Sequence, residues 1–110
     1  MHGNVSFLEL GTVDTESSRE FFAQVFGWSF HPMSQGSGWF QAPSMRVGMH
    51  GDDPHPQIYV FLEVPELEKA MTLVREAGGE AEPPTSEPGF GKFSNCRDPQ
   101  GIRFGLHQRA

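Results

Sequence analysis

The apolar residues of the first 30 positions predict a strand followed by a helix. Val5–Leu10 has the apolar content of a strand. Asp14 then suits a helix N-cap, because its carboxylate can accept hydrogen bonds from free backbone N–H groups. Apolar residues recur at helical spacing as far as Phe26. Gly27 readily adopts a left-handed conformation and is expected to end this helix.

Short apolar stretches between turn residues predict three further strands in the first half. We expect them at Trp28–Phe30, Trp39–Ala42 and Met45–His50, with a turn or loop at Pro32–Gly38. The first half therefore has the order β-α-β-β-β.

The second half predicts the same order of elements. Ile58–Val64 is a strand that is apolar except for Glu63, and Pro65 suits the first turn of a helix at Glu66–Ala77. Gly78 and Gly79 are expected to end this helix. The remaining expected elements are a weak strand at Glu80–Pro84, a loop at Thr85–Phe90, and strands at Lys92–Asn95 and Ile102–His107.

The two halves also share a sequence pattern. Met45–His50 and Ile102–His107 both have the order apolar-Arg-apolar-Gly-apolar-His. Gly38-Trp39-Phe40 corresponds in the same way to Gly91-Lys92-Phe93. We infer one domain, residues 1–110, made of two repeated modules at about 5–51 and 57–108. A fold built by duplication commonly has its site where the copies meet.

Composition and charge narrow the class of protein. The chain has 110 residues, 36% of them hydrophobic, which suffices for one core. No apolar stretch has the length of a membrane helix, and Met1–Asn4 lacks the start of a signal peptide. A lone Cys96 fits a reducing compartment, so we expect a cytoplasmic protein without a membrane partner. A net charge of −6 without any Lys/Arg run argues against binding to nucleic acid.

Strand alternation assigns polar and aromatic side chains to one face. Because neighbouring residues of a strand point to opposite faces, Phe7 and Glu9 lie on one face while Leu8 and Leu10 lie against the helix. Gly48 and Gly105 are expected to remove bulk at the centre of the same face. The candidate ligand-binding residues are Phe7, Glu9, Arg46, His50, Tyr59, Phe61, Glu63, Arg103 and His107.

This face has two interpretations. It can be an aromatic-walled pocket with convergent polar groups, as in small-molecule sites. It can also be a filled interior with Arg–Glu pairs and with His50 and His107 at solvated strand ends. Glu9 is the candidate catalytic acid or base, because partial burial would raise its pKa, whereas a nearby arginine would lower it. Elsewhere, Trp28 and Trp39 can line the cleft or lie in the core, and we expect the core. His31 and His55 are expected on surface loops, and Cys96 as a buried thiol.

Three segments of the chain carry a resemblance to a known superfamily. They are Phe21–Trp28, Glu63–Glu68 and Asp98–Leu106. With the repeated module, they resemble the vicinal oxygen chelate superfamily, which includes glyoxalase I, bleomycin-resistance proteins and extradiol dioxygenases. The resemblance implies an α+β fold of the glyoxalase/bleomycin-resistance type, in which two β-α-β-β-β modules form curved mixed sheets around a cavity. It also implies a homodimer, with modules that pair within the chain or between chains.

The resemblance further implies where a metal would be held. In metal-containing members, the ligand positions correspond to Phe7, Gly48, Tyr59 and Gly105 here. A divalent metal needs several N or O ligands, and this set does not provide them. We therefore expect no metal and no other cofactor, as in the branch of glyoxalase-like proteins that lacks the usual metal ligands.

The expected function is metal-independent binding of a small organic molecule, as in bleomycin-resistance proteins. Those proteins favour cationic ligands, which agrees with the net charge of −6, whereas Arg46 and Arg103 favour an anion. The sequence leaves the charge of the ligand open. The alternatives are a lyase, isomerase or dioxygenase that uses a relocated divalent metal or Glu9 as base, and a subunit with an interaction role only.

Overall fold

The computed structural model describes residues 3–110. Met1 and His2, which belong to the segment expected not to be a signal peptide, lie outside the described residues. The chain forms two compact units. We call residues 7–59 the N-terminal unit, and residues 60–110 with the described residues up to Ser6 the C-terminal unit. Within residues 3–110, neither helix has the length and apolar character needed to cross a membrane.

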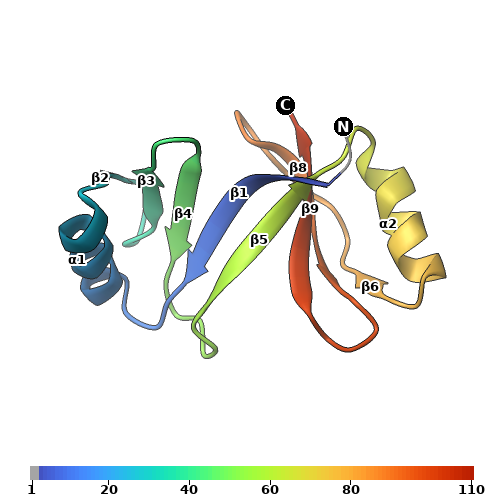
Figure 1. Cartoon of the computed structure of the whole chain (residues 1–110), viewed down its shortest axis with the longest axis horizontal. Coiled ribbons are helices and arrows are strands. Elements are labelled where there is room, and N and C mark those ends of the chain that lie inside the picture. The colour runs from blue at the N-terminus through green and yellow to red at the C-terminus, as the bar shows by residue number, and fades with distance from the viewer. Residues whose placement is uncertain (1–2) are drawn as a thin grey trace. The chain divides into compact units, whose positions relative to one another are not determined.

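The N-terminal unit contains one helix and four strands (Figure 1). In chain order they are β1 (Asn4–Gly11), which enters this unit at Phe7, α1 (Thr15–Phe26), β2 (Ser29–Pro32), β3 (Gly38–Gln41) and β4 (Arg46–His50). From residue 8 onward β1 runs parallel to β4, and β3 pairs antiparallel with both β4 and β2. The predicted caps of α1 are confirmed: Asp14 Oδ1 accepts from the Glu16 amide at 3.1 Å, and Gly27 is left-handed with φ of 71°.

The core of this unit lies between its sheet and α1. Its buried residues are Leu10, Phe40, Ala42, Val47 and Met49. Phe22 and Ala23 of α1 pack against this core, although α1 itself has no fully buried residue. Trp28 also packs here, as predicted.

The C-terminal unit repeats the arrangement with one additional strand. Its elements are β5 (Gln57–Glu63), which begins in the N-terminal unit, α2 (Leu67–Glu76), β6 (Glu80–Ala81), β7 (Thr85–Glu87), β8 (Gly91–Arg97) and β9 (Arg103–Arg109). β5 is parallel to β9, and β8 is antiparallel to β9, β6 and β7. The core contains Val64, Leu67, Met71, Cys96 and Leu106, so the predicted burial of the Cys96 thiol is confirmed.

The α+β class, both helices and the order of elements agree with the sequence prediction, but three details differ. The expected loop at Thr85–Phe90 contains β7, which pairs with β8 through Thr85 and Phe93. All three residues of β7 are exposed, so no apolar pattern marks this strand. The weak strand expected to reach Pro84 ends at Ala81. Pro65 precedes the N-cap Glu66 instead of lying in the first turn of α2.

Candidate functional site

One row of side chains crosses the N-terminal sheet on the face opposite α1. Cross-strand pairs join His31 to Trp39, Trp39 to Gly48, and Gly48 to Glu9. Directly paired residues point to the same face of a sheet. The neighbouring row contains the core residues Phe40 and Val47, which lie toward α1. The row of Glu9 therefore lies on the other face, which we call the polar face of the N-terminal unit.

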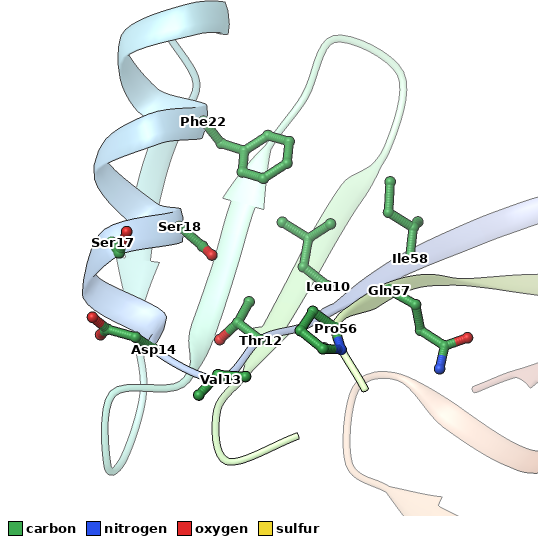
Figure 2. Close-up of a pocket in the computed structure, with 11 residues that line it drawn as sticks. Leu10, Thr12, Val13, Asp14, Ser17, Ser18, Phe22, Pro56, Gln57 and Ile58 are labelled. Atoms are coloured by element: carbon green, nitrogen blue, oxygen red, sulfur yellow. The ribbon is translucent and has the colours of Figure 1, made fainter. Parts of the chain in front are cut away.

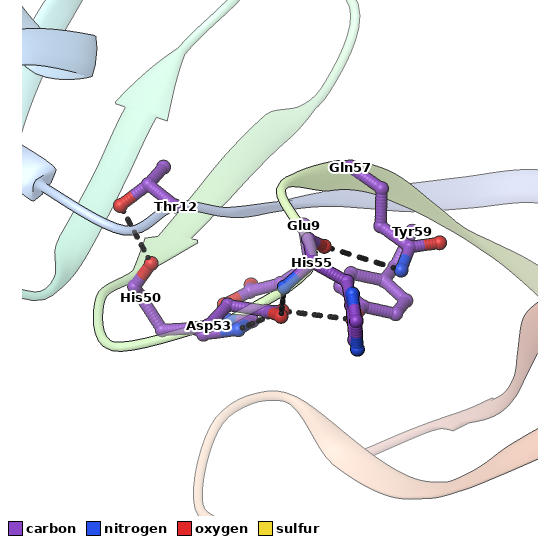
Figure 3. Close-up of polar contacts among 7 residues, drawn as sticks. All are labelled: Glu9, Thr12, His50, Asp53, His55, Gln57 and Tyr59. Carbon is purple, nitrogen blue, oxygen red and sulfur yellow. Dashed lines mark hydrogen bonds and ion pairs between the residues drawn. The ribbon is translucent and has the colours of Figure 1, made fainter.

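Four side chains near the end of β4 form one connected group, which we call the carboxylate–histidine cluster (Figure 3). His50 Nδ1 lies 2.7 Å from Glu9 Oε2, and His50 Nε2 lies 3.2 Å from Asp53 Oδ2. The Tyr59 hydroxyl donates to Asp53 Oδ2 at 2.8 Å, and the His55 amide donates to Asp53 Oδ1 at 2.9 Å. The cluster thus joins β1, the end of β4, the following linker and β5.

The surroundings of His50 favour its protonated form. Burial lowers the pKa of His50, but hydrogen bonds and charges from Glu9 and Asp53 outweigh burial and raise the pKa above its ordinary value. The pKa of Asp53 is lowered by the hydrogen bonds from the His55 amide and the Tyr59 hydroxyl, against a smaller effect of burial. The side chains of His50 and Glu9 are 40% and 24% exposed, so this charged pair is accessible to a solute.

Two glycines allow these side chains to lie close to the sheet. A Cβ atom on Gly48 would collide with the Glu9 carboxylate and would lie 2.7 Å from Cζ of Phe7. A Cβ on Gly11 would collide with the Asp53 carboxylate and would lie 2.8 Å from the ring of Tyr59. Gly48 thus removes bulk at this point, as expected, and Glu9 and Phe7 fill the space above it.

Trp39 lies on the polar face and not in the core, which corrects the sequence prediction. His31 stacks on its ring with centroids 4.0 Å apart, and Arg46 Cζ lies 4.0 Å from the Trp39 ring centroid. His31 belongs to β2 and not to a surface loop, and β2 and β4 flank β3. The pairing of Trp39 with Gly48 explains this placement, but sequence patterns alone did not reveal that register.

The equivalent face of the C-terminal unit is filled by aromatic rings. Phe61 pairs with Gly105 and occupies the position that Glu9 has opposite Gly48. A Cβ on Gly105 would lie only 2.5 Å from the Phe61 ring, so the absence of a side chain here makes room for that ring. Phe90 and Phe93 contact Phe61 edge to face, with centroids 6.1 and 5.8 Å away.

His107 is buried within this aromatic region, so the expectation of a solvated strand end is wrong. His107 is only 3% exposed, and its ring stacks on that of Phe90 with the ring centroids 3.9 Å apart. His107 Nδ1 lies 2.8 Å from Ser6 Oγ, and Nε2 lies 2.7 Å from the Phe90 carbonyl oxygen. Both ring nitrogens therefore have partners inside the unit.

The structure divides the nine candidate residues between the two units. Phe7, Glu9, Arg46, His50 and Tyr59 belong to the N-terminal unit, and Phe61, Glu63, Arg103 and His107 to the C-terminal unit. Glu63 forms an ion pair with Arg109 at 2.9 Å, and Arg103 is an exposed residue at the start of β9. Their convergence on one cavity stays a prediction. Asp53 was missed by sequence analysis, because it lies in the linker and reaches the cluster only through the local turn.

The residues at the inherited metal positions do not fit a glyoxalase-type metal. Glu9 and Phe7 cover Gly48, and the Tyr59 hydroxyl donates to Asp53. Among residues 3–110, no group of three or more His, Cys, Asp or Glu side chains is arranged to hold a metal ion.

Comparison with known sequences gave one curated relative. It is 29% identical over 70 residues, which is 64% of this chain, and is described as a "Glyoxylase-like domain-containing protein" from Didymella fabae. The match covers 53% of that protein, so the chain spans about half the length of this relative. No family model matches the sequence.

Solved structures resemble nearly the whole chain. Methylmalonyl-CoA epimerase from Mycobacterium tuberculosis has a TM-score of 0.73 at 14% identity, covering 98% of this chain and 88% of the epimerase. Homoprotocatechuate 2,3-dioxygenase from Arthrobacter globiformis has a TM-score of 0.79 at 17% identity, covering 99% and 37%. The Mn(II)-bound glyoxalase from Novosphingobium aromaticivorans has a TM-score of 0.76 at 19% identity, covering 98% and 40%. The resemblance to the vicinal oxygen chelate superfamily is thus confirmed at the level of the fold, and this chain has the glyoxalase-like fold of that superfamily.

Proposed function

We propose that this protein binds a small organic molecule, without a metal, on the polar face of the N-terminal unit. The observation that carries the proposal is the carboxylate–histidine cluster, in which Glu9, His50, Asp53 and Tyr59 converge from separate segments. Such preorganised polar groups fix the orientation of a ligand at little further entropic cost.

The composition of the polar face indicates the chemistry of the ligand. Two carboxylates and one imidazole leave the cluster negative whether or not His50 is protonated, and the one positive charge of Arg46 lies against Trp39 instead. Beside the cluster, Phe7 provides aromatic surface, whereas the ring of Trp39 is already covered by His31 and Arg46. These features favour a planar molecule that carries a cationic or hydrogen-bond-donating group. The C-terminal unit has no equivalent charged cluster, because Phe61 takes the place of the Glu9 carboxylate there. This difference supports placing the ligand on the N-terminal unit.

A second candidate function is metal-free proton transfer, of the kind an isomerase or lyase needs. The 2.7 Å contact between Glu9 and His50 favours it, because a carboxylate and an imidazole in direct contact can share and release a proton. In that reaction Glu9 would act as the general base. The epimerase with the same fold makes this class of chemistry a reasonable alternative.

Benzamidinium is a suitable first probe, because it is a planar cation whose two N–H groups match a carboxylate. In an NMR titration we expect it to shift the backbone amides of Glu9, Trp39 and His50, and we expect benzoate to leave them unchanged. Glu9→Gln should weaken binding by roughly 10- to 100-fold, which corresponds to about 1.5–3 kcal/mol for a hydrogen bond to a charged group.

Glu63→Gln is the matched control, because Glu63 belongs to the other unit and forms an ion pair with Arg109. It should bind benzamidinium like the wild type. Equal binding by the Glu9→Gln variant, or preferred binding of benzoate, would refute the proposal.

A further inference from the structure

A pocket of about 360 Å³ lies on the α1 side of the N-terminal unit, apart from the carboxylate–histidine cluster (Figure 2). We propose that this pocket is a second binding site, and that it takes a compact, uncharged molecule with one apolar ring and one hydroxyl group. None of the nine candidate residues from the sequence lines it. Six of the residues that line it determine what it can bind, and they are Leu10, Val13, Asp14, Ser18, Phe22 and Ile58.

The pocket arises because α1 packs unevenly on the sheet. Toward its C-terminal end, Phe22 stacks with Phe26 and Trp28, with ring centroids 6.1 Å apart in both pairs. One turn earlier the same stripe carries Ser18, whose small side chain cannot reach the sheet. Residues four apart lie on one face of a helix, so Ser18 leaves open the space that a larger apolar side chain would fill.

The walls of the pocket are suited to an apolar ring. Leu10 is 4% exposed and belongs to the core, and Phe22 packs against that core. Val13 and Ile58 also line the pocket, yet they are 61% and 54% exposed. Apolar side chains that are half exposed around one concave space bury further area when a ring enters it.

The polar groups of the pocket select against an anion. Asp14 contributes a carboxylate, of which Oδ1 already accepts from the Glu16 amide at 3.1 Å. Its full negative charge outweighs the partial positive charge of the helix N-terminus. The Ser18 hydroxyl can donate to or accept from a ligand hydroxyl. Thr12 Oγ1, in contrast, donates to the His50 carbonyl oxygen at 3.0 Å.

Benzyl alcohol has the proposed size and chemistry, so it is the probe for this site. In an NMR titration of the full chain, we expect saturable shifts of the amides of Ser18 and Ile58. Affinity should be in the millimolar range expected for a ligand with so few atoms. Benzoate, which carries a carboxylate in place of the hydroxymethyl group, should give no saturable shift at these amides.

Two variants test the location. Ser18→Leu should weaken benzyl alcohol binding by about tenfold or more, because leucine fills the space that the ring needs. Ser44→Leu, an identical change at an exposed turn position, should leave binding unchanged. If Ser18→Leu perturbs folding, Ile58→Ser provides a milder variant at an exposed position, and it should also weaken binding.

Three results would overturn the second site. They are an absence of saturable shifts at Ser18 and Ile58, equal binding of benzyl alcohol by wild type and both pocket variants, or stronger binding of benzoate. The Glu9→Gln variant should bind benzyl alcohol like the wild type. Benzamidinium shifts at Glu9 and His50 report on the polar face, and benzyl alcohol shifts at Ser18 and Ile58 report on the pocket, so the two proposals can fail separately.

Discussion

His50 and His107 occupy equivalent places in the repeated pattern, but their surroundings give them different properties. His50 lies between the carboxylates of Glu9 and Asp53 and is partly exposed. His107 is buried against Phe90 and uses both ring nitrogens inside its unit. The difference originates one strand away, where one module has Glu9 and the other has Phe61. Sequence equivalence therefore predicts the position of a side chain here, but not its electrostatic role.

The raised pKa of His50 predicts a pH-dependent stability. Folding raises this pKa, so the stabilisation is complete below the unfolded value of about 6.5 and is lost as the pH rises through the folded value. The free energy of unfolding, from urea denaturation at a series of pH values, should fall across this interval in the wild type. His50→Gln should reduce that fall. The same pH dependence in both proteins would contradict the cluster geometry.

Asp53 should also make stability depend on pH, but in the acidic range and with the opposite sign to His50, so that the free energy of unfolding falls as the pH falls. Its pKa is lowered by folding, so its stabilisation is present above the unfolded value of about 3.8 and is lost as the pH falls through the folded value. Asp53→Asn should therefore weaken the acid-induced loss of stability in the same series of urea denaturations. An unchanged acid limb in this variant would show that Asp53 has no such role.

Gly105 should be intolerant of any side chain. Gly105→Ala places a methyl group against the Phe61 ring, which Phe90 and Phe93 surround, so we expect a loss of about 1–3 kcal/mol from overpacking. Phe61→Leu in the same chain should recover part of this loss, which a double-mutant cycle by urea denaturation measures. A Gly105→Ala protein of wild-type stability would show that the ring moves freely.

The site was predictable from sequence only to the extent that strand alternation determines it. Strand alternation predicts that Glu9 and His50 lie on the face away from α1. The observed β1–β4 register agrees, because it pairs Glu9 with Gly48, which lies on that face. Asp53 lies outside the strands, and its position depends on a linker in which Asp52 has a φ of 58°. The position of Trp39 depends on the β3–β4 register, which sequence periodicity does not determine.

At the scale of elements, the strongest sequence signals are local and chemical. Asp14 and Gly27 mark both ends of α1 because each satisfies a specific backbone requirement. β7 lacks any such signal: its residues are exposed, and it is held by backbone pairing with β8. A short strand of this kind forms because a neighbouring strand offers backbone hydrogen bonds, and its own side chains give no sequence signal.

The N-cap of α1 offers a direct test at this scale. Asp14→Ala should lower the free energy of unfolding by about 0.5–2 kcal/mol, because the Glu16 amide loses its acceptor. Asp14→Asn should retain most of the stability, since asparagine caps equally well. Urea denaturation distinguishes the two variants, and equal losses would mean that charge, not capping, is what Asp14 contributes.

At the scale of the whole molecule, the two units share an order of elements but have different surfaces. Both keep a glycine in the last strand, β4 or β9, and in both a side chain of the paired strand covers it. In the N-terminal unit that side chain is a carboxylate within a charged cluster, and in the C-terminal unit it is a phenyl ring within an aromatic cluster. The solved structures with this fold include an epimerase, a dioxygenase and a glyoxalase, so the fold alone does not define the chemistry.

Calorimetric titration of chelator-treated protein with benzamidinium decides whether binding at Glu9 needs a metal. We expect the wild type to bind equally well before and after removal of metals, and Glu9→Gln to bind roughly 10- to 100-fold more weakly. Binding that disappears on chelation and returns with added Zn²⁺ or Mn²⁺ would contradict metal-independent binding at Glu9, as would unchanged affinity in the Glu9→Gln variant.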